Sequence, residues 1–176
     1  MVDKNTLTLN EFFNNCDAWA KRSRLDKESD ASSQMGKGAE EFGELLRHVC
    51  YTKDIHQIKD AIGDIAVCLS NASIFKSKVY RALMAEAFEY NTKKNHLAIL
   101  REMSDIFLDG VVSTSALYKL CVLLKQLCNQ FDINHQECFY IAWHDIKDRK
   151  LIIRDKVAVK WENMTDAEKI EYEQAH

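Results

Sequence analysis

Residues 34–71 read QMGKGAEEFGELLRHVCYTKDIHQIKDAIGDIAVCLSN and predict two helices joined by a turn at 52–55. Apolar residues recur three and four positions apart in both halves, which is the spacing of one helix face. We expect the first helix to span 34–51 and the second to end near Phe75. Two amphipathic helices of this kind must pack against each other or against further elements, so the stretch predicts the centre of an all-α fold.

Each predicted helix carries an acidic pair on one face. Glu41 and Glu44 are three residues apart, and Asp60 and Asp64 are four apart. Residues with these spacings share a helix face. If the four carboxylates converged at about 6 Å, each pair would repel by about 3 kcal/mol at an effective dielectric constant of about 20. A hard divalent cation removes this cost, and oxygen-only ligands favour Mg²⁺ or Mn²⁺, so the pairs predict a magnesium cluster.

The acidic pairs belong to longer polar stripes. In the first helix the stripe also contains Gln34, Lys37 and His48, and it borders the apolar face. Partial burial of charge at such a border is typical of a binding site. Glu40 lies further round the helix, as a peripheral ligand or a partner for Lys37. Asn71 extends the second stripe, and its amide suits a water or a sugar hydroxyl. The alternative interpretation is a solvated face with Lys or Arg partners.

A basic segment, DIKDRK, follows at 145–150. Cations at the end of a helix suit its dipole, which is the structural interpretation of Lys147 and Arg149. The functional interpretation is phosphate binding. Together with a magnesium cluster, these two side chains would hold a triphosphate from both sides.

The rest of the chain is also predicted to be helical. Further helices are expected over 9–24, opened by a Thr8 or Asn10 cap, and over 82–89, 97–108, 115–131 and 136–150. The polar segment 26–33 is expected to be a mobile connection. Residues 157–161 alternate as in a short strand or an extended arm, and Thr165 with Glu168 forms a capping box for a last polar helix.

Composition indicates one domain, 1–176, with an insertion at about 76–115 and a C-terminal tail at about 151–176. The chain has 47% hydrophobic residues, no proline and five glycines, which favours a helical core. A net charge of −3 argues against duplex nucleic acid as a partner. The start, Met1 to Lys4, lacks a signal pattern, and the sequence has no apolar stretch long enough to span a bilayer. We therefore expect a cytoplasmic protein, in which the six cysteines are reduced core residues.

These motifs together resemble the all-α nucleoside triphosphate pyrophosphohydrolases, the MazG-like and dimeric dUTPase-like group. The resemblance is carried, in order, by Trp19-Ala20, Gln34-x-x-Lys37-x-x-Glu40-Glu41-x-x-Glu44, Asp60-Ala61-Ile62-Gly63-Asp64, Asn71 and Ile146-Lys147-Asp148-Arg149-Lys150. It implies a core bundle of four to five helices with a helical insertion. It also implies Mg²⁺-dependent hydrolysis of a nucleoside triphosphate, with a deoxynucleotide expected, to the monophosphate and pyrophosphate by a homodimer or homotetramer.

The resemblance also implies roles for individual residues. The metal ligands would be Glu41, Glu44 and Asp64, while Glu40 would assist as a ligand or base. The usual second motif is Glu-x-x-Asp, and here Ala61 stands where its Glu is expected, so Asp60 is the nearest substitute ligand.

The implied substrate-binding residues form a second group. Contacts to phosphates or ribose would come from Lys37, Asn71, Lys147 and Arg149, and contacts to the nucleoside from Trp19 and Gln34. The base, the sugar and the subunit count stay open.

Two rival interpretations remain. The first is a non-catalytic helical protein of the same fold that binds a nucleotide or a partner, and Ala61 is its best support. The second is a hydrolase of the phosphoribosyl-ATP type, which would carry out the same chemistry on a different substrate.

Overall fold

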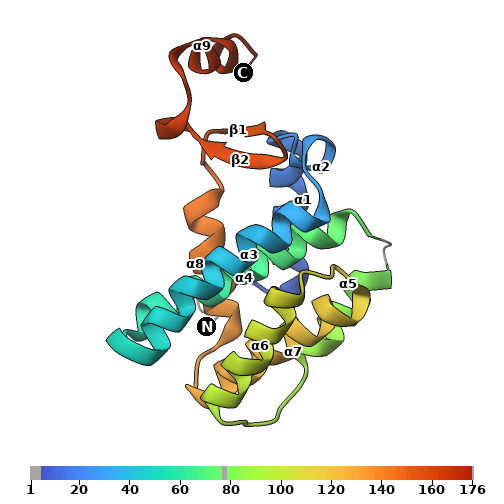
Figure 1. The fold of residues 1–176 in the computed structure, drawn as a ribbon, viewed down its shortest axis with the longest axis vertical. Coiled ribbons are helices and arrows are strands. Elements are labelled where there is room, and N and C mark those ends of the chain that lie inside the picture. Colours follow the sequence, from blue (N-terminus) through green and yellow to red (C-terminus); the bar gives the residue numbers. More distant parts are fainter. Residues whose placement is uncertain (1–4, 77–78, 176) are drawn as a thin grey trace.

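The chain is mostly helical, in agreement with the all-α prediction, and carries one small two-stranded sheet (Figure 1). The computed structural model describes residues 5–76 and 79–175. Residues 1–4, which entered the expectation about a signal pattern, lie outside the described residues, as do 77–78 of the predicted insertion. Along the chain the elements are α1 (Leu9–Arg22), α2 (Leu25–Glu28), α3 (Ala31–Arg47), α4 (Ile55–Ile74), α5 (Val79–Phe88), α6 (His96–Asp109), α7 (Thr114–Gln130), α8 (His135–Ile146), β1 (Leu151–Arg154), β2 (Val157–Lys160) and α9 (Asp166–Ala175).

The two helices predicted from residues 34–71 are α3 and α4. Asp54 caps α4 by accepting a hydrogen bond from the backbone N–H of His56 at 2.9 Å. Between the two helices, His48–Thr52 forms a π-helical segment, so α3 ends earlier than predicted. The predicted helices are confirmed, with shifted boundaries.

The expectation of a mobile connection at 26–33 is wrong. The short helix α2 occupies its first part, and Leu25 at the start of α2 is buried in the core. The helix α3 begins at Ala31, because the Asp30 side chain accepts a hydrogen bond from the backbone N–H of Ser33 at 2.8 Å. The polar composition of this segment did not indicate the buried Leu25 beside it or the helix N-cap at Asp30.

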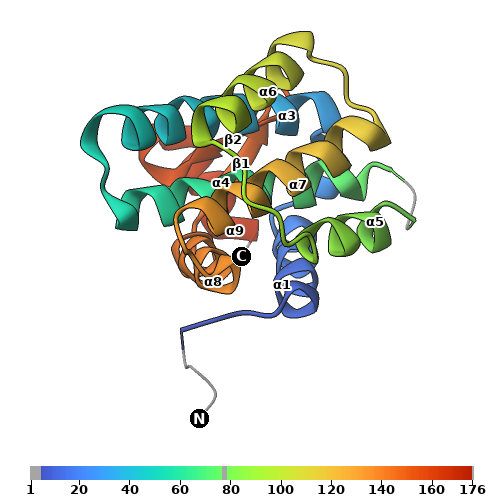
Figure 2. The same ribbon diagram turned by 90° about the horizontal axis from the view of Figure 1, so that it is seen from below.

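The core is built around α4. Its residues Ile58, Ile62, Ile65 and Leu69 are buried, and α3, α8, α1 and α7 all contact this helix. The helices α1 and α8 lie side by side, where the ring of Phe12 stacks on that of Phe139 at 4.4 Å (Figure 2). Because α4 is covered on several sides, a carboxylate on this helix is readily desolvated.

The predicted insertion is helical and belongs to the same core. The helices α5 and α6 both pack on α7, and their residues Met84, Ile99 and Met103 are buried. The ring of Phe107 on α6 stacks on Phe42 of α3 at 5.2 Å. This segment therefore supports α3 from the side opposite the β-hairpin (Figure 1).

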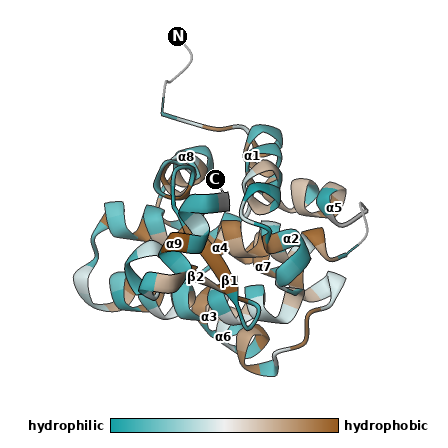
Figure 3. Ribbon diagram, turned by 90° about the horizontal axis from the view of Figure 1, so that it is seen from above, coloured by the Kyte–Doolittle hydropathy of each residue, from teal (hydrophilic) through white to brown (hydrophobic). Residues whose placement is uncertain are grey.

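The C-terminal segment forms a hairpin of β1 and β2 followed by α9, which lies beyond the hairpin in Figure 1. The predicted strand at 157–161 is confirmed as β2. The predicted helix 136–150 is too long, because α8 ends at Ile146 and Leu151 starts β1. Figure 3 shows the apolar character of β1 against the hydrophilic α9.

The capping box of Thr165 and Glu168 at the start of α9 is confirmed by both of its hydrogen bonds. In the described part of the chain, no helix is long and apolar enough to cross a membrane.

The helix α8 packs tightly against α4 at Gly63. A Cβ atom at this position would overlap the carbonyl oxygen of Cys138 and lie 2.7 Å from the Cβ of Ala142. Glycine is therefore required in the second acidic motif by packing. This contact also draws the C-terminal end of α8, with Asp145, toward the acidic face of α4.

We predict that Gly63→Ala lowers the free energy of unfolding by about 1–3 kcal/mol, because α8 must move away from α4. Urea denaturation measures the change. The matched control is Gly36→Ala on exposed α3 surface, where a Cβ meets no described atom within 4 Å. That variant should gain up to about 1 kcal/mol from helix propensity. Equal stabilities of the two variants would contradict this account of the α4–α8 contact.

Candidate functional site

A pocket of about 90 Å³ lies between α1, α3, α4 and β2. Many of the residues predicted from the sequence line it, namely Trp19, Gln34, Lys37, Glu41, Asp64, Asn71 and Arg149. Val157, Ala158 and Lys160 of β2 form the remaining wall. The volume is well below the roughly 300–1,000 Å³ of sites that enclose a drug-sized molecule, so a ligand would enter it only in part.

Two buried polar atoms of the pocket residues have no hydrogen-bond partner among the described residues. They are Nε1 of Trp19 and Oδ1 of Asn71, and the two side chains are 5% and 2% exposed. Buried polar groups are almost always paired, and an unpaired one costs about 1–3 kcal/mol. A ligand that offers one acceptor and one donor would satisfy both atoms.

Asp64 is the most perturbed carboxyl group of the site. Burial raises its pKa to about 7, and repulsion from Glu41, Asp60 and Asp145 acts in the same direction. The guanidinium of Arg149 acts against this rise. Negative charge is therefore crowded at one wall of the pocket, as the two acidic motifs predict.

Asp60 belongs to the same cluster. Its pKa is raised by burial first and by the Asp145 carboxylate second, with smaller contributions from Glu41 and Glu44. The four carboxylates predicted as metal ligands therefore interact electrostatically. Asp145 on α8 joins them as a fifth.

Lys37 offsets part of this charge. Its ammonium lies 2.6 Å from Oε2 of Glu40 and 2.9 Å from Oε1 of Glu41. Burial disfavours the ammonium, but the two glutamates outweigh that effect and raise the pKa of Lys37. A second ion pair joins Arg149 to Asp145.

Within residues 5–76 and 79–175, no three His, Cys, Asp or Glu side chains are grouped so that they could hold a metal ion as they stand. The side chains of Lys37 and Arg149 instead neutralise individual carboxylates. The donor set is all oxygen, which suits a hard divalent cation. Such an ion would relieve the repulsion between carboxylates that helps to raise the pKa of Asp64.

Several predicted residues lie outside the pocket wall. Glu40 and Glu44 are exposed, and Asp60 is half-buried at the edge of the acidic cluster. Lys147 lies apart from the pocket, where its carbonyl accepts a hydrogen bond from the Arg22 guanidinium. Its role in phosphate binding stays a prediction.

Sequence reasoning missed Asp145 and Lys160. Asp145 lies in the last turn of α8 and pairs with Arg149, which follows the helix four residues later. Lys160 ends β2, and its position at the pocket follows only from the hairpin, whose first strand was not predicted.

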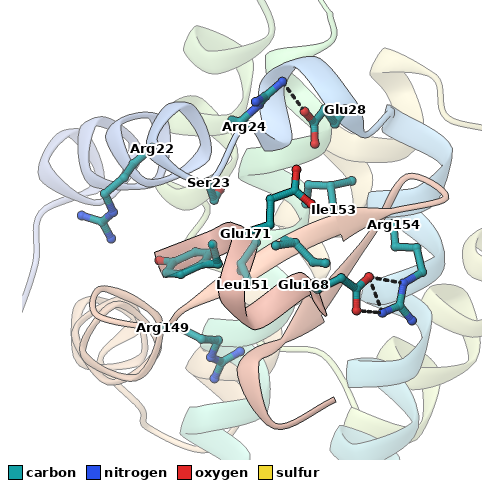
Figure 4. Close-up of a pocket in the computed structure, with 12 residues that line it drawn as sticks. Arg22, Ser23, Arg24, Glu28, Arg149, Leu151, Ile153, Arg154, Glu168 and Glu171 are labelled. Atoms are coloured by element: carbon teal, nitrogen blue, oxygen red, sulfur yellow. Dashed lines mark hydrogen bonds and ion pairs between the residues drawn. The ribbon is translucent and has the colours of Figure 1, made fainter. Parts of the chain in front are cut away.

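A larger pocket of about 330 Å³ lies on the other side of the hairpin, against α9. Figure 4 shows that two of its arginines are paired with glutamates, Arg24 with Glu28 at 2.6 Å and Arg154 with Glu168 at 2.5 Å. Its lining contains none of the acidic residues of α3 and α4. We therefore take the smaller pocket as the candidate functional site.

We predict that Asp64 makes the metal-free protein less stable as pH rises from about 4 to about 7. The folded state binds a proton at Asp64 up to a pKa of about 7, whereas the unfolded chain releases it near 3.8, so folding takes up a proton in this window. The effect reaches about 4 kcal/mol at most, at about 1.4 kcal/mol per pKa unit. At pH 8, Asp64→Asn should therefore be more stable than the natural chain.

Urea denaturation at several pH values tests this, with the exposed Asp105→Asn on α6 as control. Mg²⁺ at pH 8 should stabilise the natural chain and not Asp64→Asn. A stability difference between the two that does not change between pH 4 and pH 8 would contradict the assignment.

Three kinds of comparison of this chain with known proteins found no match. No family model matches it, and neither a curated protein nor a solved structure does.

Proposed function

We propose that the chain hydrolyses a nucleoside triphosphate, with a deoxynucleotide expected, to the monophosphate and pyrophosphate in a Mg²⁺-dependent reaction. The observation that carries this proposal is Asp64, a partly buried carboxyl group crowded by other carboxylates at the wall of a pocket with unpaired polar atoms. A partly apolar pocket beside an acidic cluster suits a nucleotide bound together with a divalent cation. We also propose that the helices form the bundle that is typical of the MazG-like pyrophosphohydrolases.

The nucleoside would enter the pocket. Trp19 offers an apolar ring and an unpaired N–H, and Asn71 offers an unpaired oxygen. The small volume fits a base or a sugar and leaves the phosphates outside. Gln34 would act on the nucleoside through Asn71, to which it is hydrogen-bonded at 3.3 Å.

The phosphates would lie along the acidic cluster at the mouth of the pocket. Lys37, Arg149 and Lys160 line the pocket and would donate to phosphate oxygens. Lys37 and Arg149 would exchange their present carboxylate partners for the substrate.

Mg²⁺ would be held by Glu41, Glu44, Asp60 and Asp64, where it supplies charge neutralisation and orients a water. Glu40 would assist as a ligand or base. A water oxygen would add to the α-phosphorus as its proton passes to Glu40, the bond to the α–β bridging oxygen would break, and pyrophosphate would leave. The expected homodimer or homotetramer belongs to the same proposal, supported by exposed apolar side chains such as Tyr51 and Leu108.

One observation favours the non-catalytic alternative. In the described part of the chain Lys37 already pairs with Glu41, and Ala61 stands in place of a ligand. A chain whose lysine permanently replaced the cation could bind a nucleotide without hydrolysing it. Measured binding without turnover would identify this alternative.

We predict hydrolysis when the purified protein is incubated with a panel of ribo- and deoxynucleoside triphosphates and Mg²⁺. Ion-exchange chromatography should resolve monophosphate and pyrophosphate and rank the bases in one experiment. Asp64→Asn and Glu44→Gln should each lower kcat by roughly 100-fold or more. Each change removes a charge that would hold the cation at the reacting phosphate.

The control for this experiment is Asp105→Asn, an exposed change on α6, with circular dichroism to verify folding of every variant. Full activity of Asp64→Asn would refute its assignment, and full activity of Glu44→Gln would refute that of Glu44. No turnover across the panel with Mg²⁺ or Mn²⁺ would refute the enzymatic proposal.

A further inference from the structure

A chain of hydrogen bonds connects the tip of the β1–β2 hairpin to the floor of the pocket. Ser29 Oγ donates to the backbone carbonyl of Lys156 at 2.6 Å, and Gln34 Nε2 donates to Ser29 Oγ at 3.0 Å. Asn71 Nδ2 then donates to Gln34 Oε1 at 3.3 Å. This series of hydrogen bonds ends at Asn71 Oδ1, which is buried and has no partner among the described residues.

The direction of this chain is determined at its outer end. A backbone carbonyl only accepts hydrogen bonds, so the single hydroxyl hydrogen of Ser29 is used on Lys156. Ser29 Oγ must then accept from Gln34, which turns the amide NH₂ of Gln34 toward Ser29 and its oxygen toward Asn71. The NH₂ of Asn71 faces that oxygen, and its own oxygen is left as the free atom. Amide orientation is assigned by such networks, and here every step agrees.

The hairpin tip is held at this position by a second interaction. Lys156 Nζ lies 2.8 Å from Oδ2 of Asp30, the cap of α3. Both central residues of the turn, Asp155 and Lys156, have positive φ, at 50° and 69°. Non-glycine residues adopt this conformation only at an energetic cost. The ion pair and the Ser29 hydrogen bond offset that cost and keep the carbonyl in place.

We propose that the β1–β2 hairpin sets the selectivity of the pocket: through Ser29 and Gln34 it makes Asn71 a hydrogen-bond acceptor, so the part of the ligand that enters must present an N–H or O–H donor. This inference rests on the proposed function, because the probes that test it are nucleotides. The donor has two sources, an amino group of the base or the 3′-hydroxyl of the sugar. Ser29 and Gln34 are positioning residues, and Asn71 is the group that contacts the ligand.

The ligand test compares three probes by calorimetry, with Ca²⁺ in place of Mg²⁺ to prevent turnover. The probes are dATP, its analogue without the 6-amino group, and 2′,3′-dideoxy-ATP. The natural chain should bind one of the two analogues about tenfold more weakly than dATP, and which one it is identifies the source of the donor. In Asn71→Leu this ratio should fall to about one, because Leu keeps the size and removes the acceptor.

The positioning role is tested by Ser29→Ala against Ser32→Ala, an exposed residue on the first turn of α3 that does not line the pocket. Ser29→Ala should lower the discrimination about fivefold, the effect of one hydrogen bond, and Ser32→Ala should keep it. Equal binding of all three probes by the natural chain, or unchanged discrimination in Ser29→Ala, would overturn the inference.

A readout without nucleotide separates this inference from the proposed function. In ¹⁵N NMR spectra of the free protein, Ser29→Ala should shift the side-chain amide signals of Gln34 and Asn71 and speed hydrogen exchange at 157–160, and Ser32→Ala should do neither. If these changes occur while none of the probes binds, the hydrogen-bond chain stands and the proposed function fails for adenine nucleotides. If the signals stay unchanged, the hydrogen-bond chain itself is refuted.

Discussion

The rest of the structure depends on the close packing of α4 against α3 and α8. At Gly63 the backbone of α8 comes so near that a methyl group would overlap it, and α3 covers the adjoining face of α4. Two acidic helix faces and the end of a third helix are thereby drawn to one place. Carboxylates that would repel little in water become desolvated, and the raised pKa of Asp64 is the result. The crowded carboxylates lower the stability of the folded protein, as is common at functional sites.

The same packing leaves room for a pocket beside the cluster. Its interior combines an aromatic ring with unpaired polar atoms, while its rim carries lysine and arginine side chains. Acidic groups, basic groups and a partly apolar pocket lie together, and this combination is the basis of the proposed hydrolysis of a nucleoside triphosphate. The hairpin connects this site to the C-terminal segment, because one of its strands forms a wall and its tip orients an amide in the floor.

Much of this could be predicted from the sequence, where the signal was local. The helical periodicity of 34–71, the capping box at Thr165 and the shared faces of the acidic pairs all depend on residues a few positions apart. The errors have local causes too: the polar composition of 26–33 concealed the buried Leu25 and the cap at Asp30. Leu151, Ile152 and Ile153 of β1 are consecutive apolar residues, so this strand of four residues shows no alternation that would predict it. The link from Ser29 to Lys156 spans 127 positions and leaves no pattern in the sequence.

The central claim is that the acidic faces of α3 and α4 form a divalent-cation site. Titration with paramagnetic Mn²⁺, followed by ¹H–¹⁵N NMR of the full chain, tests it most directly, because Mn²⁺ broadens signals near its binding site. The account predicts that amide signals around Glu41 and Asp64 disappear first, while those around Asp105 on α6 and Glu171 on α9 persist. Broadening that begins at Asp105 or Glu171, or no broadening even at millimolar Mn²⁺, would contradict it.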